Sequence, residues 1–194
     1  MKTIIVPAWE FYDEGLRQFM NGKETKLVLE HSLLSLSKWE AIYNKPFLSS
    51  DVSGMEMLEY IKCMTISTNI SDYTYFALTE QNIEEIKAYI NAPMSARRVR
   101  ALEENKNPNS KKKKQDLPAE SIYYWMTILN IPFEPCEKWH INRLLSLIEY
   151  CSDKNEEANP NKKKKKKSPR QLISEFNRIN EQNAKILFNK NKEG

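Results

Sequence analysis

The residues of this chain that could bind a metal or act as a catalytic nucleophile or base are few. They are its two histidines and three cysteines: His31, His140, Cys63, Cys136 and Cys151. Cys136 and His140 have the C-x3-H spacing of a pair of zinc ligands, and Cys151 follows them. A fourth ligand would have to come from His31 or Cys63, far away along the chain, and no CxxC pair is present. We therefore predict free buried thiols, and we expect no metal or other cofactor.

Signatures of enzymatic catalysis are missing from the sequence. The four glycines form no phosphate-binding loop, and neither a G-x-S-x-G nucleophile elbow nor an H-E-x-x-H zinc motif occurs. His31 follows a strand-like segment and opens a helical one, which favours a polar cap or a packed ring over a base. His140 lies between Trp139 and Ile141 in a helical pattern and has the same interpretation. We predict that the protein is not an enzyme.

The composition favours one helical domain with polar appendages. The chain has 194 residues, of which 40% are hydrophobic and 29% charged, and only 4 glycines, too few for a turn-rich all-β fold. The longest apolar run, residues 4–9, is shorter than the roughly 18 residues of a membrane span and does not suit a signal peptide. We therefore expect a cytoplasmic protein.

The net charge of +4 comes from two lysine runs, residues 111–114 and 162–167. Without these runs, 20 basic residues face 26 acidic ones, so the rest of the chain is mildly acidic. Blocks of like charge repel each other and stay solvated, which favours flexible segments. Non-specific contact with a polyanion is the alternative interpretation.

Periodicity indicates where the strands and helices lie. Residues 3–6 and 26–29 read as two strands, and Asn21-Gly22 between them is a turn signal. Apolar residues at helical spacing run from Leu33 to Tyr43, from Met57 to Met64, from Ile83 to Ile90, from Ile122 to Leu129 and from Trp139 to Cys151. Ser53 with Glu56 forms a capping box, and Thr79 is a candidate N-cap. Because only a short proline-containing turn separates the last two patterns, we expect them to pack as an antiparallel helical hairpin.

These elements predict a mostly helical α+β fold, with a helical bundle-like core and a small N-terminal β-hairpin. The core domain should span residues 1–152 and contain a mobile Lys-rich insertion near 95–116. A Lys-rich linker over 153–168 should lead to a C-terminal amphipathic helix over 169–190. That helix begins at a second capping box and carries an apolar stripe that includes Phe176, Ile179 and Ile186.

Six segments, in one order, carry a family resemblance. They are LEHSLLSLSKWE (29–40), KPFL (45–48), YIKCMT (60–65), INAPM (90–94), IYYWMTILNIPF (122–133) and KWHINRLL (138–145). Together they resemble the tail assembly chaperones of long-tailed, siphovirus-like bacteriophages over most of residues 1–152.

The resemblance implies a non-enzymatic protein that binds the tape measure protein, and the tail tube protein as a second candidate partner. Such chaperones coat the long helical tape measure, keep it soluble and give way as the tube assembles. It also implies action in the cytoplasm of the bacterial host, absence from the mature virion and scope for self-association. Family members are often made in short and long forms by ribosomal frameshifting, for which the run at 162–167 is a candidate site.

Candidate partner contacts are the C-terminal stripe and the linker lysines: Phe176, Ile179, Ile186, Lys162, Lys163 and Lys164. An amphipathic helix can cover an apolar client helix reversibly, although the stripe could instead dock on the body of its own chain. Two other functions stay open. One is a structural tail or head–tail connector protein, and the other is a nucleic-acid-binding accessory protein that uses its lysine runs.

Overall fold

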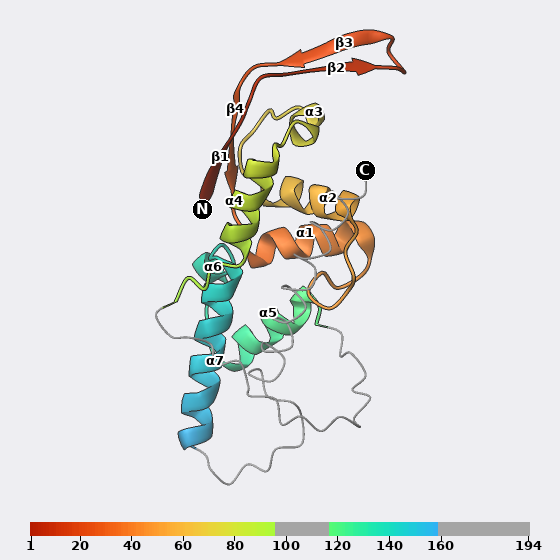
Figure 1. Ribbon diagram of the computed structural model, residues 1–194. Helices are drawn as coiled ribbons and strands as arrows, with labels where there is room; N and C mark the ends of the chain where they lie inside the picture. The colour runs from red at the N-terminus through yellow and green to blue at the C-terminus, as the bar shows by residue number, and fades with distance from the viewer. Residues whose placement is uncertain (96–116, 159–194) are drawn as a thin grey trace, which may run out of the picture.

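The computed structural model describes residues 1–95 and 117–158 (Figure 1). This part of the chain has the predicted mostly helical α+β fold. Its strands are β1 (Lys2–Val6), β2 (Trp9–Asp13), β3 (Gln18–Gly22) and β4 (Thr25–Leu29). Its helices are α1 (Leu33–Tyr43), α2 (Gly54–Met64), α3 (Asp72–Phe76), α4 (Glu80–Ile90), α5 (Ala119–Ile128), α6 (Phe133–Cys136) and α7 (Ile141–Ala158).

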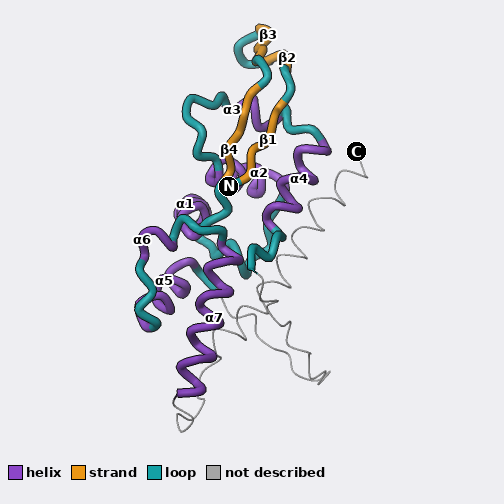
Figure 2. The backbone as a smooth tube through the Cα atoms, turned by 90° about the vertical axis from the view of Figure 1, so that its left-hand side faces the viewer, coloured by secondary structure: helices purple, strands orange, loops and turns teal. Residues whose placement is uncertain are grey.

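The four strands form two successive antiparallel pairs. β1 pairs with β4, with Lys2 opposite Leu29, which confirms the two strands predicted over residues 3–6 and 26–29. Farther from the body, β2 pairs with β3. Figures 1 and 2 show that the β2–β3 hairpin projects beyond the helices, next to α3.

The predicted turn at Asn21-Gly22 is wrong, because both residues belong to β3. The chain turns over residues 14–17 instead, where Arg17 has a positive φ of 52° and the Leu16 amide donates to the Asp13 carboxylate at 2.8 Å. Gly22 has a different role: it faces Trp9 across the strands, and a Cβ there would lie 2.3 Å from the indole. The glycine therefore makes room for the Trp9 ring.

Side-chain caps define the starts of three helices. Ser53 and Glu56 form the predicted capping box of α2, and Thr79 caps α4 as predicted, with Asn82 completing the box. Ser32 caps α1 together with Ser35. Each box satisfies backbone N–H groups that have no partner within the helix. α1 ends at Tyr43, and the capping residue Asn44 has the left-handed conformation, two positions before Pro46.

The core lies where the inner face of the β1–β4 pair meets the helices. α4 packs across β1, and its Asn82 side chain donates to the Ile5 carbonyl at 3.0 Å. α2 and α5 both pack against α1. The largest fully buried side chains come from all of these parts: Trp39, Tyr60, Phe47, Ile4, Leu27, Leu29, Leu33, Leu36, Leu48, Met64 and Ile122. Burying one such apolar side chain contributes about 1.5–3 kcal/mol.

The predicted antiparallel hairpin of the last two helices is wrong. α5 packs chiefly on α1, and Figures 1 and 2 show α5 and α7 crossing each other rather than lying side by side. The short helix α6 stands between them and redirects the chain. α7 continues to Ala158, past the predicted end of the core domain at residue 152.

The predicted insertion, linker and C-terminal helix lie mostly outside the described residues. The insertion near 95–116, except its first residue, and the C-terminal helix over 169–190 lie outside the described residues. The same holds for all but the first residues of the linker over 153–168, and for every candidate partner contact: Phe176, Ile179, Ile186, Lys162, Lys163 and Lys164.

Candidate functional site

Both histidines meet in one buried polar cluster, which we call the junction: His31, Tyr60, Tyr89 and His140. The His31 and His140 rings approach edge to face, with centroids 5.0 Å apart. His31 Nδ1 lies 2.5 Å from the Tyr60 hydroxyl, and His140 Nε2 lies 2.9 Å from the Tyr89 carbonyl oxygen. The Ile141 amide donates to the His31 carbonyl at 2.8 Å. The junction thus ties the end of β4 to α2, α4 and the start of α7.

Hydrogen bonds assign a neutral form to His140. A carbonyl only accepts, so Nε2 donates to the Tyr89 oxygen, and Nδ1 accepts from the Asn142 amide at 3.2 Å. Burial lowers the pKa of His140, because a charged ring would lose its hydration.

His31 is held neutral in the same way. Burial, and then the neighbouring His140, lower the pKa of His31 well below its ordinary value. Burial raises the pKa of Tyr60, so its hydroxyl stays protonated. His31 is fully buried, and its Nε2 has no hydrogen-bond partner among the described residues. The prediction that His31 is a packed ring is confirmed, and its contacts link β4 to α2 and α7.

The thiols are less buried than predicted. All three are free, but only Cys136 is buried, whereas Cys63 and Cys151 are half-buried. Burial raises the pKa of Cys63 to about 11, so it remains a thiol at neutral pH. Within residues 1–95 and 117–158, no group of three or more His, Cys, Asp or Glu side chains is placed to hold a metal ion. Cys136, His140 and Cys151 therefore do not form a shared ligand set.

A buried carboxylate that the sequence analysis missed links α1 to α5. Glu40 accepts from the Phe47 amide at 2.9 Å and from the Ala119 amide at 2.8 Å. Burial raises its pKa, while the two amide hydrogen bonds act in the opposite direction. Because Ala119 is the first residue of α5, this one side chain supplies the helix with the N-terminal acceptor that Pro118 cannot provide.

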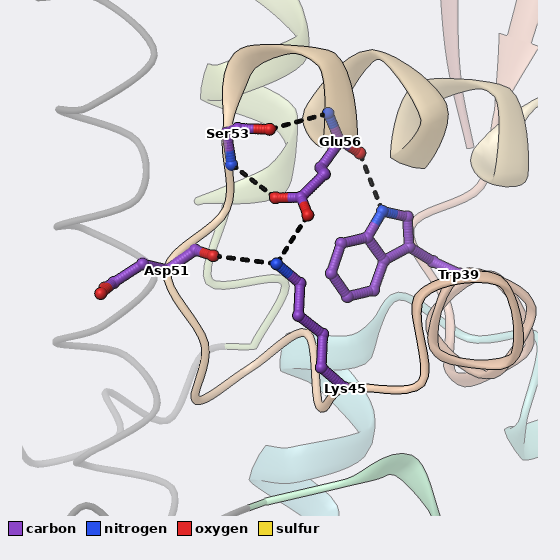
Figure 3. A network of polar contacts seen from close by, with 5 residues as sticks. All are labelled: Trp39, Lys45, Asp51, Ser53 and Glu56. Atoms are coloured by element: carbon purple, nitrogen blue, oxygen red, sulfur yellow. Dashed lines mark hydrogen bonds and ion pairs between the residues drawn. The ribbon is translucent and has the colours of Figure 1, made fainter.

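A second polar link joins the end of α1 to α2 (Figure 3). Lys45 reaches the Glu56 carboxylate at 2.6 Å and the Asp51 carbonyl at 3.3 Å. The Trp39 indole donates to the Glu56 carbonyl at 2.8 Å. Hydrogen bonds from Lys45 and from the Ser53 amide lower the pKa of Glu56. The figure shows these groups converging on the first turn of α2, so the contacts are structural.

The projecting β2–β3 hairpin has one braced face. There the Trp9 and Phe11 rings stack at 5.4 Å, and Tyr73 of α3 lies 5.8 Å from Trp9. The Tyr73 hydroxyl also donates to the Asp13 carboxylate, which lowers the pKa of that carboxyl. α3 therefore holds the hairpin in place from one side.

The other face of the hairpin, which we call the outer face, is not covered by any other described part of the chain. Tyr12 and Phe19 stand directly opposite each other on β2 and β3, with ring centroids 5.2 Å apart in an edge-to-face contact. Their exposed fractions are 53% and 67%, and Leu16 at the tip is 61% exposed. Glu10 and Glu14 are also exposed beside Tyr12. Clustered exposed apolar side chains are typical of interaction surfaces.

A second exposed apolar group lies on α5 and α6. Tyr124 and Ile128, four residues apart on one side of α5, are 62% and 54% exposed. Phe133 is exposed as well, and its ring contacts that of Tyr123 at 5.3 Å. Both exposed groups are clusters of apolar side chains of the kind found at interaction surfaces.

Comparisons with known proteins add no relative: no family model, curated protein or solved structure matches this chain. No helix in the described residues has the length and apolar character needed to cross a membrane.

The outer face of the hairpin has a signal in the sequence. Trp9, Phe11 and Asp13 alternate with Glu10 and Tyr12, which is the period of a strand with two different faces.

Proposed function

We propose that this protein is a bacteriophage tail assembly chaperone, which binds the tape measure protein and supports tail tube assembly without being an enzyme. It works in the cytoplasm of the bacterial host and is absent from the mature virion. The observation that carries the proposal is the set of six ordered segments that resemble this family.

The positions of these segments support the proposal. Segments 29–40 and 138–145 meet in the isolated bridge between Ser32 and His140. Segments 45–48 and 60–65 meet where the Phe47 and Tyr60 rings stack at 4.0 Å. The segment at 90–94 receives two hydrogen bonds from the Asn142 side chain. The resemblance therefore concerns residues that build one packed body, as a shared fold requires.

The exposed apolar groups are consistent with a role in holding a client. A helical protein with an uncovered apolar stripe aggregates unless a partner covers that stripe. The hairpin and α5 both present aromatic and aliphatic side chains to solvent. Surfaces of this kind bind by burying apolar area and need no chemical step.

The proposal is tested by co-expressing the full chain with the tape measure protein encoded in the same genome. We expect the tape measure protein to become soluble and to co-purify with the chain. A helical coiled-coil protein of similar size serves as the control client and should not co-purify. A tape measure protein that stays insoluble and unbound contradicts the proposal.

Purified virions distinguish the remaining structural alternative. A chaperone is absent from them, whereas a tail or connector component is present in fixed copy number by mass spectrometry. Finding the chain in the virion at such a copy number would favour the structural role.

A further inference from the structure

We infer that the outer face of the β2–β3 hairpin is the client-binding surface, and that it takes an amphipathic helix whose apolar stripe is flanked by Lys or Arg side chains. The identity of the client rests on the proposed function. The apolar and acidic character of the surface follows from the residues of the hairpin alone.

The apolar part of the surface is preformed. Tyr12, Phe19 and Leu16 expose more than half of their side chains, and the two rings already contact each other. On the opposite face, Trp9 packs on Tyr73 of α3, which limits the freedom of the ribbon. A rigid aromatic pair loses little conformational entropy when a partner covers it.

The charges around the aromatic pair select the partner. Between Trp9 and Gly22 the chain has three acidic residues, Glu10, Asp13 and Glu14, and one basic residue, Arg17. Asp13 is already bonded to Tyr73 on the braced face, so Glu10 and Glu14 remain beside Tyr12. A partner with basic flanks is attracted to this rim, and one with acidic flanks is repelled.

The same charges disfavour the pairing of a second copy of this chain along the β2 edge of the hairpin. If two β2 strands paired antiparallel about Tyr12, Glu10 of each copy would face Glu14 of the other. Like charges directly opposite each other destabilise a strand pair. A foreign basic helix has no such conflict.

The group on α5 and α6 differs from the outer face because it has no contact between two exposed rings. Glu134 and Lys138 form an ion pair at 3.0 Å, four residues apart, beside Phe133. Phe133 also packs against Tyr123 of the same chain. Residues 119–138 carry three acidic side chains, Glu120, Glu134 and Glu137, and one lysine. This group therefore serves as a control for apolar exposure beside a similar charge, without a pair of exposed rings in contact.

The test compares three variants of the full chain in the co-expression experiment with the tape measure protein. The double variant Tyr12→Ser/Phe19→Ser should recover about tenfold less tape measure protein than the wild type. The control Tyr124→Ser/Ile128→Ser should recover amounts within twofold of the wild type. A charge reversal, Glu10→Lys/Glu14→Lys, keeps the aromatic pair and should also lower recovery by about tenfold.

Each outcome decides one claim. If the wild type binds and all three variants bind equally well, the hairpin inference is overturned while the proposed function stands. If only the α5 control loses binding, the client site lies on α5 and α6 instead. If the wild type itself fails to bind, the proposed function falls. Should the serine variant lose its cooperative thermal unfolding, the charge reversal alone decides the inference, because its two positions are exposed.

Discussion

The junction and the hairpin use aromatic side chains in opposite ways. At the junction, His31 and Tyr60 are fully buried and hydrogen-bonded. On the hairpin, Tyr12 and Phe19 face solvent. The segments that carry the family resemblance build the body around the junction, and none of them includes residues 9–22. The segments of the resemblance therefore lie in the body, whereas the hairpin lies outside them.

The largest expected effect on stability comes from Glu40. Replacing it with Ala leaves the amides of Phe47 and Ala119 buried without acceptors. We expect the free energy of unfolding to fall by about 3 kcal/mol, because hydrogen bonds to a charged group contribute about 1.5–3 kcal/mol each. Urea denaturation measures the change. Glu40→Gln keeps one acceptor oxygen, so its free energy of unfolding should fall by about half as much. An Ala variant as stable as the wild type would contradict the link that Glu40 makes between α1 and α5.

The junction should make the protein sensitive to acid. The pKa values of His31 and His140 are lowered in the folded state, so the unfolded chain binds protons more readily as the pH falls below about 6.5. Stability is then fully present above that pH and is lost below it. We expect a loss of about 1–2 kcal/mol between pH 7 and pH 5.5.

Urea denaturation at a series of pH values measures this loss. The variant His31→Gln removes one of the two titrating rings and should show a shallower pH dependence over the same range. A wild-type stability that is constant from pH 7 to 5.5 would show that neither histidine is buried in its neutral form.

A smaller effect is expected at Gly22. A valine there would place its Cβ against the Trp9 ring and push the indole away from Tyr73. Such overpacking costs about 1–3 kcal/mol in a close-packed core. In this half-exposed hairpin we expect the free energy of unfolding to fall by about 1 kcal/mol. Hydrogen exchange should quicken in β2 and β3 while the amides of α1 and α2 keep their protection. Equal loss of protection in α1 would mean that hairpin and body unfold as one unit.

The smallest effect on stability should come from the outer face. Tyr12→Ser/Phe19→Ser removes two exposed rings and one edge-to-face contact, so the free energy of unfolding should change by less than about 1 kcal/mol. Thermal unfolding followed by circular dichroism measures it. A loss as large as that of Glu40→Ala would erase the distinction between scaffold and binding surface.

Local signals made much of the fold predictable. Strands over 3–6 and 26–29 and the caps at Ser53 and Thr79 depend on residues a few positions apart, and all were confirmed. Glu40 was not predictable, because its burial depends on an amide 79 positions away at Ala119. A glutamate in an amphipathic helix ordinarily faces solvent, and nothing local marks this one.

The hairpin was missed for a different reason. Asn21-Gly22 has the composition of a tight turn, but its glycine is required by the Trp9 indole on the neighbouring strand. The true turn over residues 14–17 has a weaker signal, with a positive φ at Arg17 instead of at a glycine. Cross-strand packing therefore explains a glycine that turn statistics assign to a loop. Because the turn was placed at the wrong residues, the hairpin and its candidate binding surface were not predicted.

The bond between the Ile141 amide and the His31 carbonyl has a consequence for the order of folding during synthesis. The strands β1–β4 and α1 emerge from the ribosome long before α7, and domains fold from the N-terminus as the chain emerges. Until residues 140 and 141 are outside the ribosome, the His31 ring has no His140 to pack on and the His31 carbonyl lacks the Ile141 amide. The junction can therefore be completed only after the start of α7 has been synthesised.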